Sequence, residues 1–181
     1  EAFECELEDV SERTGLIALQ GPAAREILRP LASIDVDDVK YYRFSEGSVA
    51  GAPAVISGTG YTGEDGFELY VDANDAPRVW DALLDEGSGA GLIPVGLGAR
   101  DSLRLEMGYA LYGSDLDEQH TTLEAGLGWV TKLDKGDFVG RDALLAQKEA
   151  GVVRRLVAMS LQTRGFPRPG YDVTHGGEVI G

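Results

Sequence analysis

The chain has 181 residues, 43% of them hydrophobic, which is enough apolar material for a folded core and excludes a disordered chain. Its 31 acidic and 16 basic residues give a net charge of −15, which argues against a general nucleic-acid-binding surface. No apolar run approaches the roughly 18 residues of a membrane span, and the lone Cys5 offers no disulfide framework. We therefore expect a cytoplasmic protein without a nucleic-acid or membrane partner.

The first two thirds of the chain predict strands that alternate with helices. Residues 1–9 alternate apolar and acidic side chains, which is typical of a half-buried strand. Further strands are predicted over residues 16–20, 38–44, 53–57 and 67–71. Proline or turn residues open helices predicted over residues 22–29, 74–86 and 96–107, the last with Leu97, Leu103 and Met107 on its apolar face. This order indicates an α+β fold with antiparallel pairing.

From Tyr112 the chain becomes rich in glycine and aspartate. A strand is predicted over 127–133, a helix over 141–150, and a long strand over 152–161 that leads into a Gly/Pro-rich tail at 165–170. We expect a domain boundary near Gly151, with one domain over 1–151 and the start of another over 152–181. The second piece is too short to close a barrel of several strands.

The most informative segment is Ser57–Tyr70, Ser-Gly-Thr-Gly-Tyr-Thr-Gly-Glu-Asp-Gly-Phe-Glu-Leu-Tyr. Its glycines allow backbone to approach a ligand closely. Tyr61 supplies an aromatic face, and Glu68 places a carboxylate on an alternating strand. Such a carboxylate is costly to bury unless a pair of donors meets it, and the edge of a pterin ring would supply that pair. The alternative is an ordinary hairpin with Glu68 on the solvent face.

The segment resembles the Gly-Tyr-Thr-Gly-Glu-Asp-Gly-Phe-Glu motif of the T-protein family of the glycine cleavage system. Four other blocks resemble the same family in the same order: Leu16-Ile-Ala-Leu-Gln-Gly-Pro22, Gly96-Leu-Gly-Ala-Arg-Asp-Ser-Leu-Arg-Leu-Glu106, Leu111-Tyr-Gly-Ser-Asp-Leu-Asp117 and Glu124-Ala-Gly-Leu-Gly-Trp129. Five ordered blocks are far more specific than a single glycine-rich motif.

The resemblance implies the folate-binding aminomethyltransferase fold, in which antiparallel sheets pack with helices, followed by the opening strands of a C-terminal β-barrel. It also implies transfer of a one-carbon unit from the aminomethyl-lipoyl arm of the H-protein to tetrahydrofolate as co-substrate, with release of ammonia. The family's essential aspartate has no counterpart before Glu1. We therefore expect this chain to be a fragment that contains no catalytic residue and has no activity by itself.

The same resemblance indicates the folate contacts. The positions that match are Tyr61, Glu68, Arg100, Tyr109, Tyr41 and Tyr42. Two of them have structural alternatives: a local salt bridge with Asp101 or another nearby acid for Arg100, and a core aromatic role for Tyr109. Tyr41 and Tyr42 are neighbours on a predicted strand, so only one of them is expected to face a given ligand.

Other chemistries find less support in the sequence. Asp115 and Asp117 lack further ordered ligands, and His120 and His175 have no partners at zinc-like spacing, so no metal site is predicted. The pattern Gly58-x-Gly60-x-x-Gly63 enters a strand rather than a helix, which excludes a dinucleotide site. Two related functions stay open: the folate module of a dimethylglycine- or sarcosine-oxidising enzyme, and a non-catalytic folate-binding scaffold.

Overall fold

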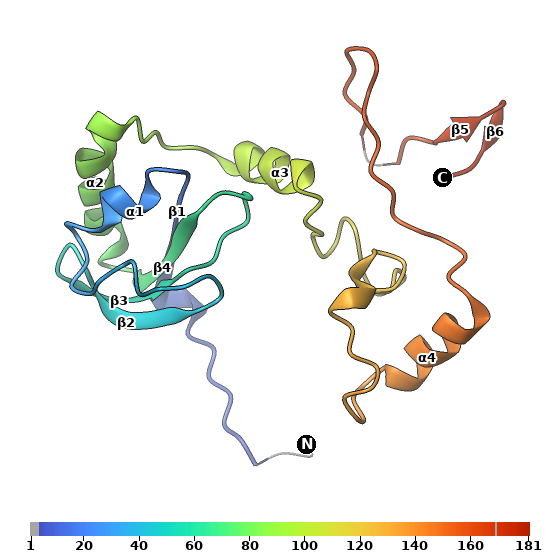
Figure 1. Ribbon diagram of the computed structural model, residues 1–181, viewed down its shortest axis with the longest axis horizontal. Coiled ribbons are helices and arrows are strands. Elements are labelled where there is room, and N and C mark those ends of the chain that lie inside the picture. The colour runs from blue at the N-terminus through green and yellow to red at the C-terminus, as the bar shows by residue number, and fades with distance from the viewer. Residues whose placement is uncertain (1–3, 169) are drawn as a thin grey trace. The chain divides into compact units, whose positions relative to one another are not determined.

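The computed structural model describes residues 4–168 and 170–181 (Figure 1). The chain forms two compact units, the first ending at Ala110 and the second beginning at Leu111. This division differs from the expected boundary near Gly151, which stays a prediction about how the whole protein is divided into domains.

The first unit is built on a four-stranded antiparallel sheet. Its strands are β1 (Thr14–Gln20), β2 (Phe44–Val49), β3 (Ala52–Ser57) and β4 (Gly66–Asp72), in the order β1-β4-β3-β2. A short helix η1 (Ser11–Arg13) precedes β1. Strand β4 lies between β1 and β3, so both of its edges are paired, and the loop that enters it is positioned by two neighbours.

Two helices, α1 (Ala24–Leu28) and α2 (Ala76–Gly87), pack beside the sheet, α2 against β1 and α1 against β4 (Figure 1). Apolar side chains of these helices, of the strands and of the loop between α1 and β2 form one core. Its largest fully buried members are Phe67, Leu28, Ile56, Leu69, Val36, Val39, Val49 and Val79. Removing such a side chain from water contributes about 1.5–3 kcal/mol each, which is the main stabilisation of this unit.

After α2 and the short helix η2 (Ser88–Ala90), an extended segment leads to α3 (Leu97–Glu106). The sequence predicted this helix, but the expected burial of its apolar face is wrong. Leu97 is 82% exposed and Met107 is 49% exposed, whereas Arg104 is the buried residue of α3. The apolar spacing identified the helix correctly but did not identify the face that this chain covers.

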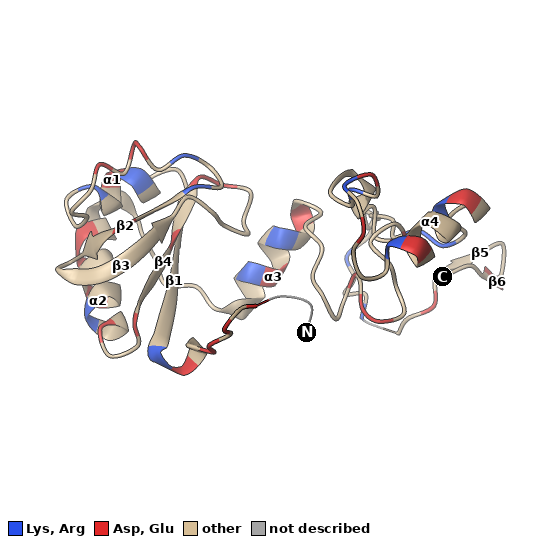
Figure 2. Ribbon diagram, turned by 90° about the horizontal axis from the view of Figure 1, so that it is seen from below, with Lys and Arg blue, Asp and Glu red and all other residues tan. Residues whose placement is uncertain are grey.

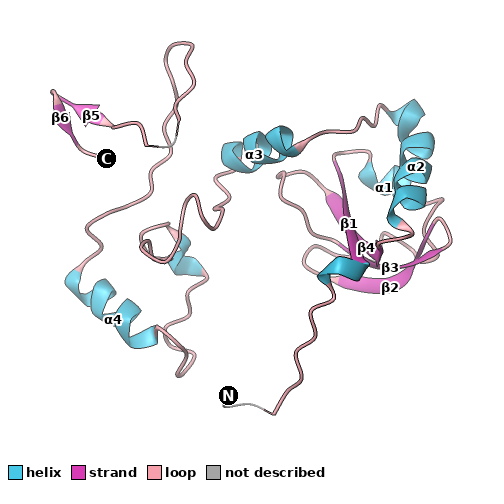
Figure 3. Ribbon diagram, turned by 180° about the vertical axis from the view of Figure 1, so that it is seen from behind, coloured by secondary structure: helices cyan, strands magenta, loops and turns pink. Residues whose placement is uncertain are grey.

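The second unit contains little regular structure (Figure 3). It holds η3 (Leu127–Trp129), α4 (Arg141–Ala150) and a small hairpin of β5 (Thr174–His175) with β6 (Glu178–Val179). Long loops connect these elements.

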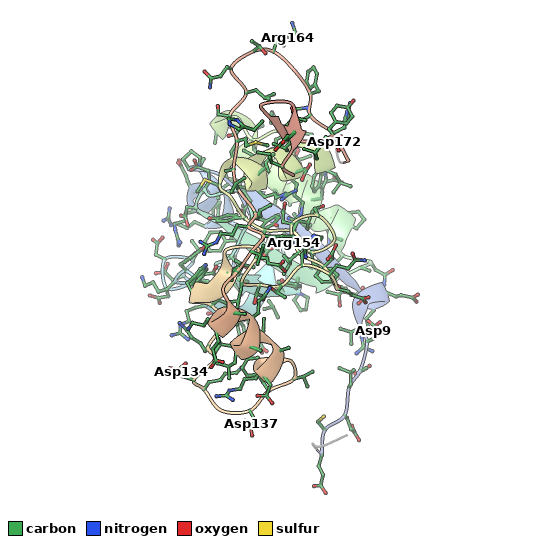
Figure 4. All side chains as sticks on the ribbon, turned by 90° about the vertical axis from the view of Figure 1, so that its right-hand side faces the viewer. Asp9, Asp134, Asp137, Arg154, Arg164 and Asp172 are labelled. Atoms are coloured by element: carbon green, nitrogen blue, oxygen red, sulfur yellow. The ribbon has the colours of Figure 1, made fainter. Side chains whose placement is uncertain are left out.

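A polar centre organises the middle of this unit. The Thr121 and Glu124 side chains cap each other's backbone N–H groups, at 2.8 Å to the Glu124 carboxylate and 3.3 Å to the Thr121 hydroxyl. Arg154, labelled in Figure 4, donates from Nε to the second Glu124 oxygen at 3.0 Å. The backbone N–H of Leu156 donates to the Glu124 carbonyl at 2.9 Å, so this one glutamate connects the loop to the chain that follows α4.

Four of the predicted strands are wrong. Residues 38–43 form no strand and contain a turn at Tyr41 and Tyr42, residues 127–129 form a 3₁₀ helix, and residues 4–9 and 152–161 have no strand. Residues 1–3 lie outside the described part of the chain. Alternating apolar residues show that one face of a segment could be buried. A strand also needs a neighbouring strand to hydrogen-bond its backbone N–H and C=O groups. Among the described residues, 152–161 pairs with no other strand.

Charged residues lie on loops and helices of both units, whereas β3 carries none (Figure 2). Within residues 4–168 and 170–181, no helix is long and apolar enough to span a membrane.

Candidate functional site

The glycine-rich loop of residues 58–65 connects β3 to β4, and its glycines are required at specific points. Gly63 has a φ of +83°, which disfavours any residue with a Cβ. A Cβ on Gly58 would lie 2.6 Å from the carbonyl oxygen of Lys40. The loop is therefore pressed closely against neighbouring backbone, and its course is fixed by packing rather than by an open turn.

Glu68 lies on β4, where it pairs with Ala18 of β1 and Ser57 of β3. Its side chain is half-buried, and its Oε2 accepts a hydrogen bond from the Thr59 hydroxyl at 2.5 Å. The Thr59 hydroxyl also lies 2.9 Å from the Ser57 hydroxyl. In the described part of the chain, the other carboxylate oxygen has no hydrogen bond, so it is available to accept one from a ligand.

Tyr61 is held at both ends of its side chain. Its hydroxyl donates to the carbonyl of Ala110 at 2.5 Å, and its ring stacks on Tyr109 with 5.8 Å between centroids and 24° between planes. The guanidinium carbon of Arg100 lies 4.8 Å from the centroid of the Tyr61 ring. Arg100, Tyr61 and Tyr109 thus form one cation–aromatic cluster, although they come from α3, the loop and the segment after α3.

The local salt bridge weighed for Arg100 belongs instead to Arg104. Arg104 donates from Nε and Nη2 to one Asp101 oxygen, at 2.9 and 2.7 Å, and from Nη1 to the Tyr109 carbonyl at 3.3 Å. Among the described residues Arg100 makes no ion pair. Spacing along the sequence could not separate the two arginines, because they lie one turn apart on the same side of the helix.

Tyr41 and Tyr42 are not on a strand, so the expectation that they face opposite sides is wrong. Tyr42 has a φ of 59°, and the two rings contact each other with 4.3 Å between centroids. A hydrogen bond with Tyr42, followed by partial burial and the proximity of Tyr109, raises the pKa of Tyr41 to about 12. Both rings are largely exposed, and Tyr109, which contributes to the raised pKa of Tyr41, also stacks on Tyr61.

A cavity of about 760 Å³ lies beside Tyr61, Glu68 and Arg100, within the first unit. Strand β1, α2 and the segment of residues 90–97 line it with mostly apolar side chains, among them Leu16, Trp80 and Ile93. Its polar lining includes three of the six predicted site residues, Tyr61, Glu68 and Arg100, together with Gln20, Thr62 and Glu64. Tyr109, Tyr41 and Tyr42 do not line it.

This arrangement suits a flat, polar ring with an apolar or flexible extension. Cavities of roughly 300–1,000 Å³ hold small-molecule ligands, usually with a few polar groups that fix orientation. The described residues include no cluster of three or more His, Cys, Asp or Glu side chains that could hold a metal ion. Arg100 adds the positive charge and Glu68 the acceptor, so the site can recognise a ligand that bears both donors and acceptors.

The profile of the GCVT N-terminal domain matches residues 1–135 of the sequence. The chain belongs to this family. The match confirms the family that the five sequence blocks indicate, and it covers every predicted contact of this GCVT domain.

Two aminomethyltransferases are similar to this chain over nearly its whole length. An aminomethyltransferase of Halothermothrix orenii is 51% identical over 97% of this GCVT chain, and one of Moorella thermoacetica is 52% identical over 99% of it. In each case the match covers 49% of the relative, so the GCVT chain spans about half the length of the curated relatives it matches.

A solved structure extends the likeness to three dimensions. The glycine cleavage system aminomethyltransferase T of Bartonella henselae superimposes with a TM-score of 0.67 at 33% identity, over 76% of the GCVT chain and 37% of that protein. The expected aminomethyltransferase fold, with antiparallel strands and packed helices, is therefore confirmed.

Proposed function

We propose that this chain supplies the folate-binding part of a cytoplasmic aminomethyltransferase of the glycine cleavage system. The reaction would transfer the one-carbon unit of an aminomethyl-lipoyl H-protein to tetrahydrofolate and release ammonia. The observation that carries the proposal is the convergence of Tyr61, Glu68 and Arg100 on one cavity, from a loop, a strand and a helix. The relatives named aminomethyltransferase support the same activity.

Each of the three residues has a role in holding the pterin of tetrahydrofolate. The Glu68 carboxylate, fixed through Oε2 by Thr59, would accept hydrogen bonds from the ring N–H and amino group at the pterin edge. Tyr61 and Arg100, whose guanidinium lies over the Tyr61 ring, would add an aromatic side chain and a planar cation to the site. The apolar lining would exclude water from the folate, and orientation of the reacting nitrogen is what such a site contributes to the rate.

Calorimetric titration of the chain with tetrahydrofolate tests the proposal. Glu68→Gln replaces one acceptor oxygen by a donor, so we expect binding to weaken by about 1–3 kcal/mol, the cost of a disturbed buried hydrogen-bonded pair. Glu46→Gln makes the same charge change on the exposed side of β2 and should leave the affinity unchanged. Equal affinities for wild type and Glu68→Gln would remove Glu68 from the site.

A further inference from the structure

Gln20 is the last residue of β1, opposite Gly66 of β4, and its side chain enters the glycine-rich loop. Its Nε2 lies 3.2 Å from each of three carbonyl oxygens, those of Leu19, Thr59 and Phe67. Its Oε1 accepts a hydrogen bond from the Thr62 hydroxyl at 3.1 Å. One amide therefore satisfies groups on β1, on β4 and at two points of the loop.

The loop is shaped to receive this side chain. A Cβ on Gly60 would collide with the Gln20 amide, and one on Gly66 would lie 2.6 Å from Nε2 and 2.5 Å from the Leu19 carbonyl oxygen. Gly60 is not in the left-handed region, so its lack of a Cβ is explained by the close approach of Gln20 rather than by its backbone angles. The glutamine occupies the space that two glycines leave open.

The contacts of Gln20 bracket the residues of the candidate site. Thr59 and Thr62 lie on either side of Tyr61, and both are held by the same amide. Thr59 in turn donates to Glu68, so Gln20 reaches that carboxylate through a single intervening residue. Gln20 itself lines the cavity.

We propose that Gln20 is a positioning residue, which holds the glycine-rich loop so that Tyr61 and Glu68 face the folate together. The inference rests on the proposed folate site and adds to it a residue that does not need to contact the pterin. The chemistry requires a glutamine: a carboxylate of the same size would face three carbonyl oxygens without a donor, and a methionine would offer neither donor nor acceptor.

Two measurements on the full chain test the proposal, with Gln20→Met and Gln20→Glu as the variants. Calorimetry gives the tetrahydrofolate affinity, and hydrogen exchange without ligand reports the opening of residues 59–66. Gln162→Met, which alters an exposed glutamine in the second unit, is the matched control. Thermal melting identifies a temperature at which every variant remains folded.

At neutral pH we expect both Gln20 variants to bind about tenfold more weakly, which corresponds to the loss of roughly one buried hydrogen bond. Their loop amides should exchange faster, while Gln162→Met matches wild type in both measurements. The carboxyl introduced by Gln20→Glu regains one donor when it is protonated. Its affinity relative to wild type should therefore recover as the pH falls, and that of Gln20→Met should not.

The outcomes separate this proposal from the function on which it rests. If wild type binds and the Gln20 variants bind equally well, the positioning role is overturned and the folate site stands. If wild type does not bind, the folate site fails, and the exchange data then decide the role of Gln20 in the loop. Unchanged exchange in both variants overturns it, and faster exchange supports it.

Discussion

Arg25 and Asp65 form a two-point ion pair, with 2.7 Å between Nε and Oδ2 and 3.2 Å between Nη2 and Oδ1. Arg25 also donates to the Val36 carbonyl at 2.7 Å, and its guanidinium carbon lies 4.9 Å from the centroid of the Phe67 ring. Asp65 ends the glycine-rich loop. The pair therefore ties α1 to the loop at the end opposite to Thr59.

Replacing Arg25 by lysine tests the importance of this geometry. A lysine keeps the charge but cannot make two parallel bonds to Asp65 while donating to Val36, so we expect a loss of about 1–2 kcal/mol in the free energy of unfolding by urea. Arg13→Lys alters an exposed pair with Glu8 and should cost at most about 0.5 kcal/mol. Equal losses in the two variants would show that the fork geometry of Arg25 contributes nothing.

The packing of Gln20 against Gly60 predicts a specific rescue. Gly60→Ala should destabilise the protein because its Cβ collides with the Gln20 amide, and the penalty should shrink when Gln20→Ala removes that amide. Gly66→Ala collides with backbone as well, so Gln20→Ala should rescue it much less. Urea unfolding of the double-mutant cycle measures both couplings, which we expect to differ by about 1 kcal/mol. Strictly additive effects at positions 20 and 60 would contradict the predicted collision.

Two arginines one turn apart on α3 should respond differently to the same change. Arg104 is buried and paired with Asp101, so Arg104→Met should lower the free energy of unfolding by about 2 kcal/mol. Arg100 faces the cavity over Tyr61, so Arg100→Met should leave stability within about 0.5 kcal/mol and weaken tetrahydrofolate binding. Urea unfolding and calorimetry on both variants separate the effects. Loss of stability rather than affinity in Arg100→Met would assign Arg100 a structural role.

Glu124 predicts an acid-sensitive contribution to the stability of the second unit. The Thr121 backbone N–H, together with Arg154, lowers the pKa of the Glu124 carboxyl from its ordinary value of 4.5. A carboxyl with a depressed folded-state pKa stabilises the protein above its unfolded value and loses that contribution as the pH falls through the folded value.

Glu124→Gln should therefore be less stable than wild type at neutral pH, and the difference should shrink as the pH falls below 4.5. Thermal melting of both proteins across this range, with Glu178→Gln as an exposed control, measures the effect. A difference that does not change with pH would mean that the charge of Glu124 plays no part.

The elements that could be predicted are those whose own residues carry the signal, at the helix ends or along the strand. Helices α2, α3 and α4 have a proline or glycine at one end or both, and β1, β3 and β4 have apolar runs near the predicted positions. Strand β2 was missed because Phe-Ser-Glu-Gly-Ser-Val has no apolar alternation; it forms because β3 pairs with it along its whole length. The segment 152–161 shows the converse, a good strand pattern that finds no partner strand in the described part of the chain.

The site was partly predictable for the same reason. Glycine-rich spacing and the charge of Glu68 pointed to the loop and β4, and Arg100 was found through its motif. Gln20 was not identified as a site residue, since a glutamine at a strand end has no distinctive pattern. The sequence signals were the place of Gln20 in the Leu16–Pro22 block and the glycines at 60 and 66, which become interpretable once the filling side chain is known.

The pairing of β1 with β4 determines when the candidate site can exist during folding. The Gln20 amide and the Phe67 carbonyl to which it donates are 47 positions apart along the chain. No local segment can therefore preassemble the loop, and its closure has to await a long-range ladder, the slow kind of event in small-domain folding. In refolding experiments, tetrahydrofolate binding should consequently follow sheet formation rather than precede it. The rate at which binding appears would then report the rate at which β1 pairs with β4.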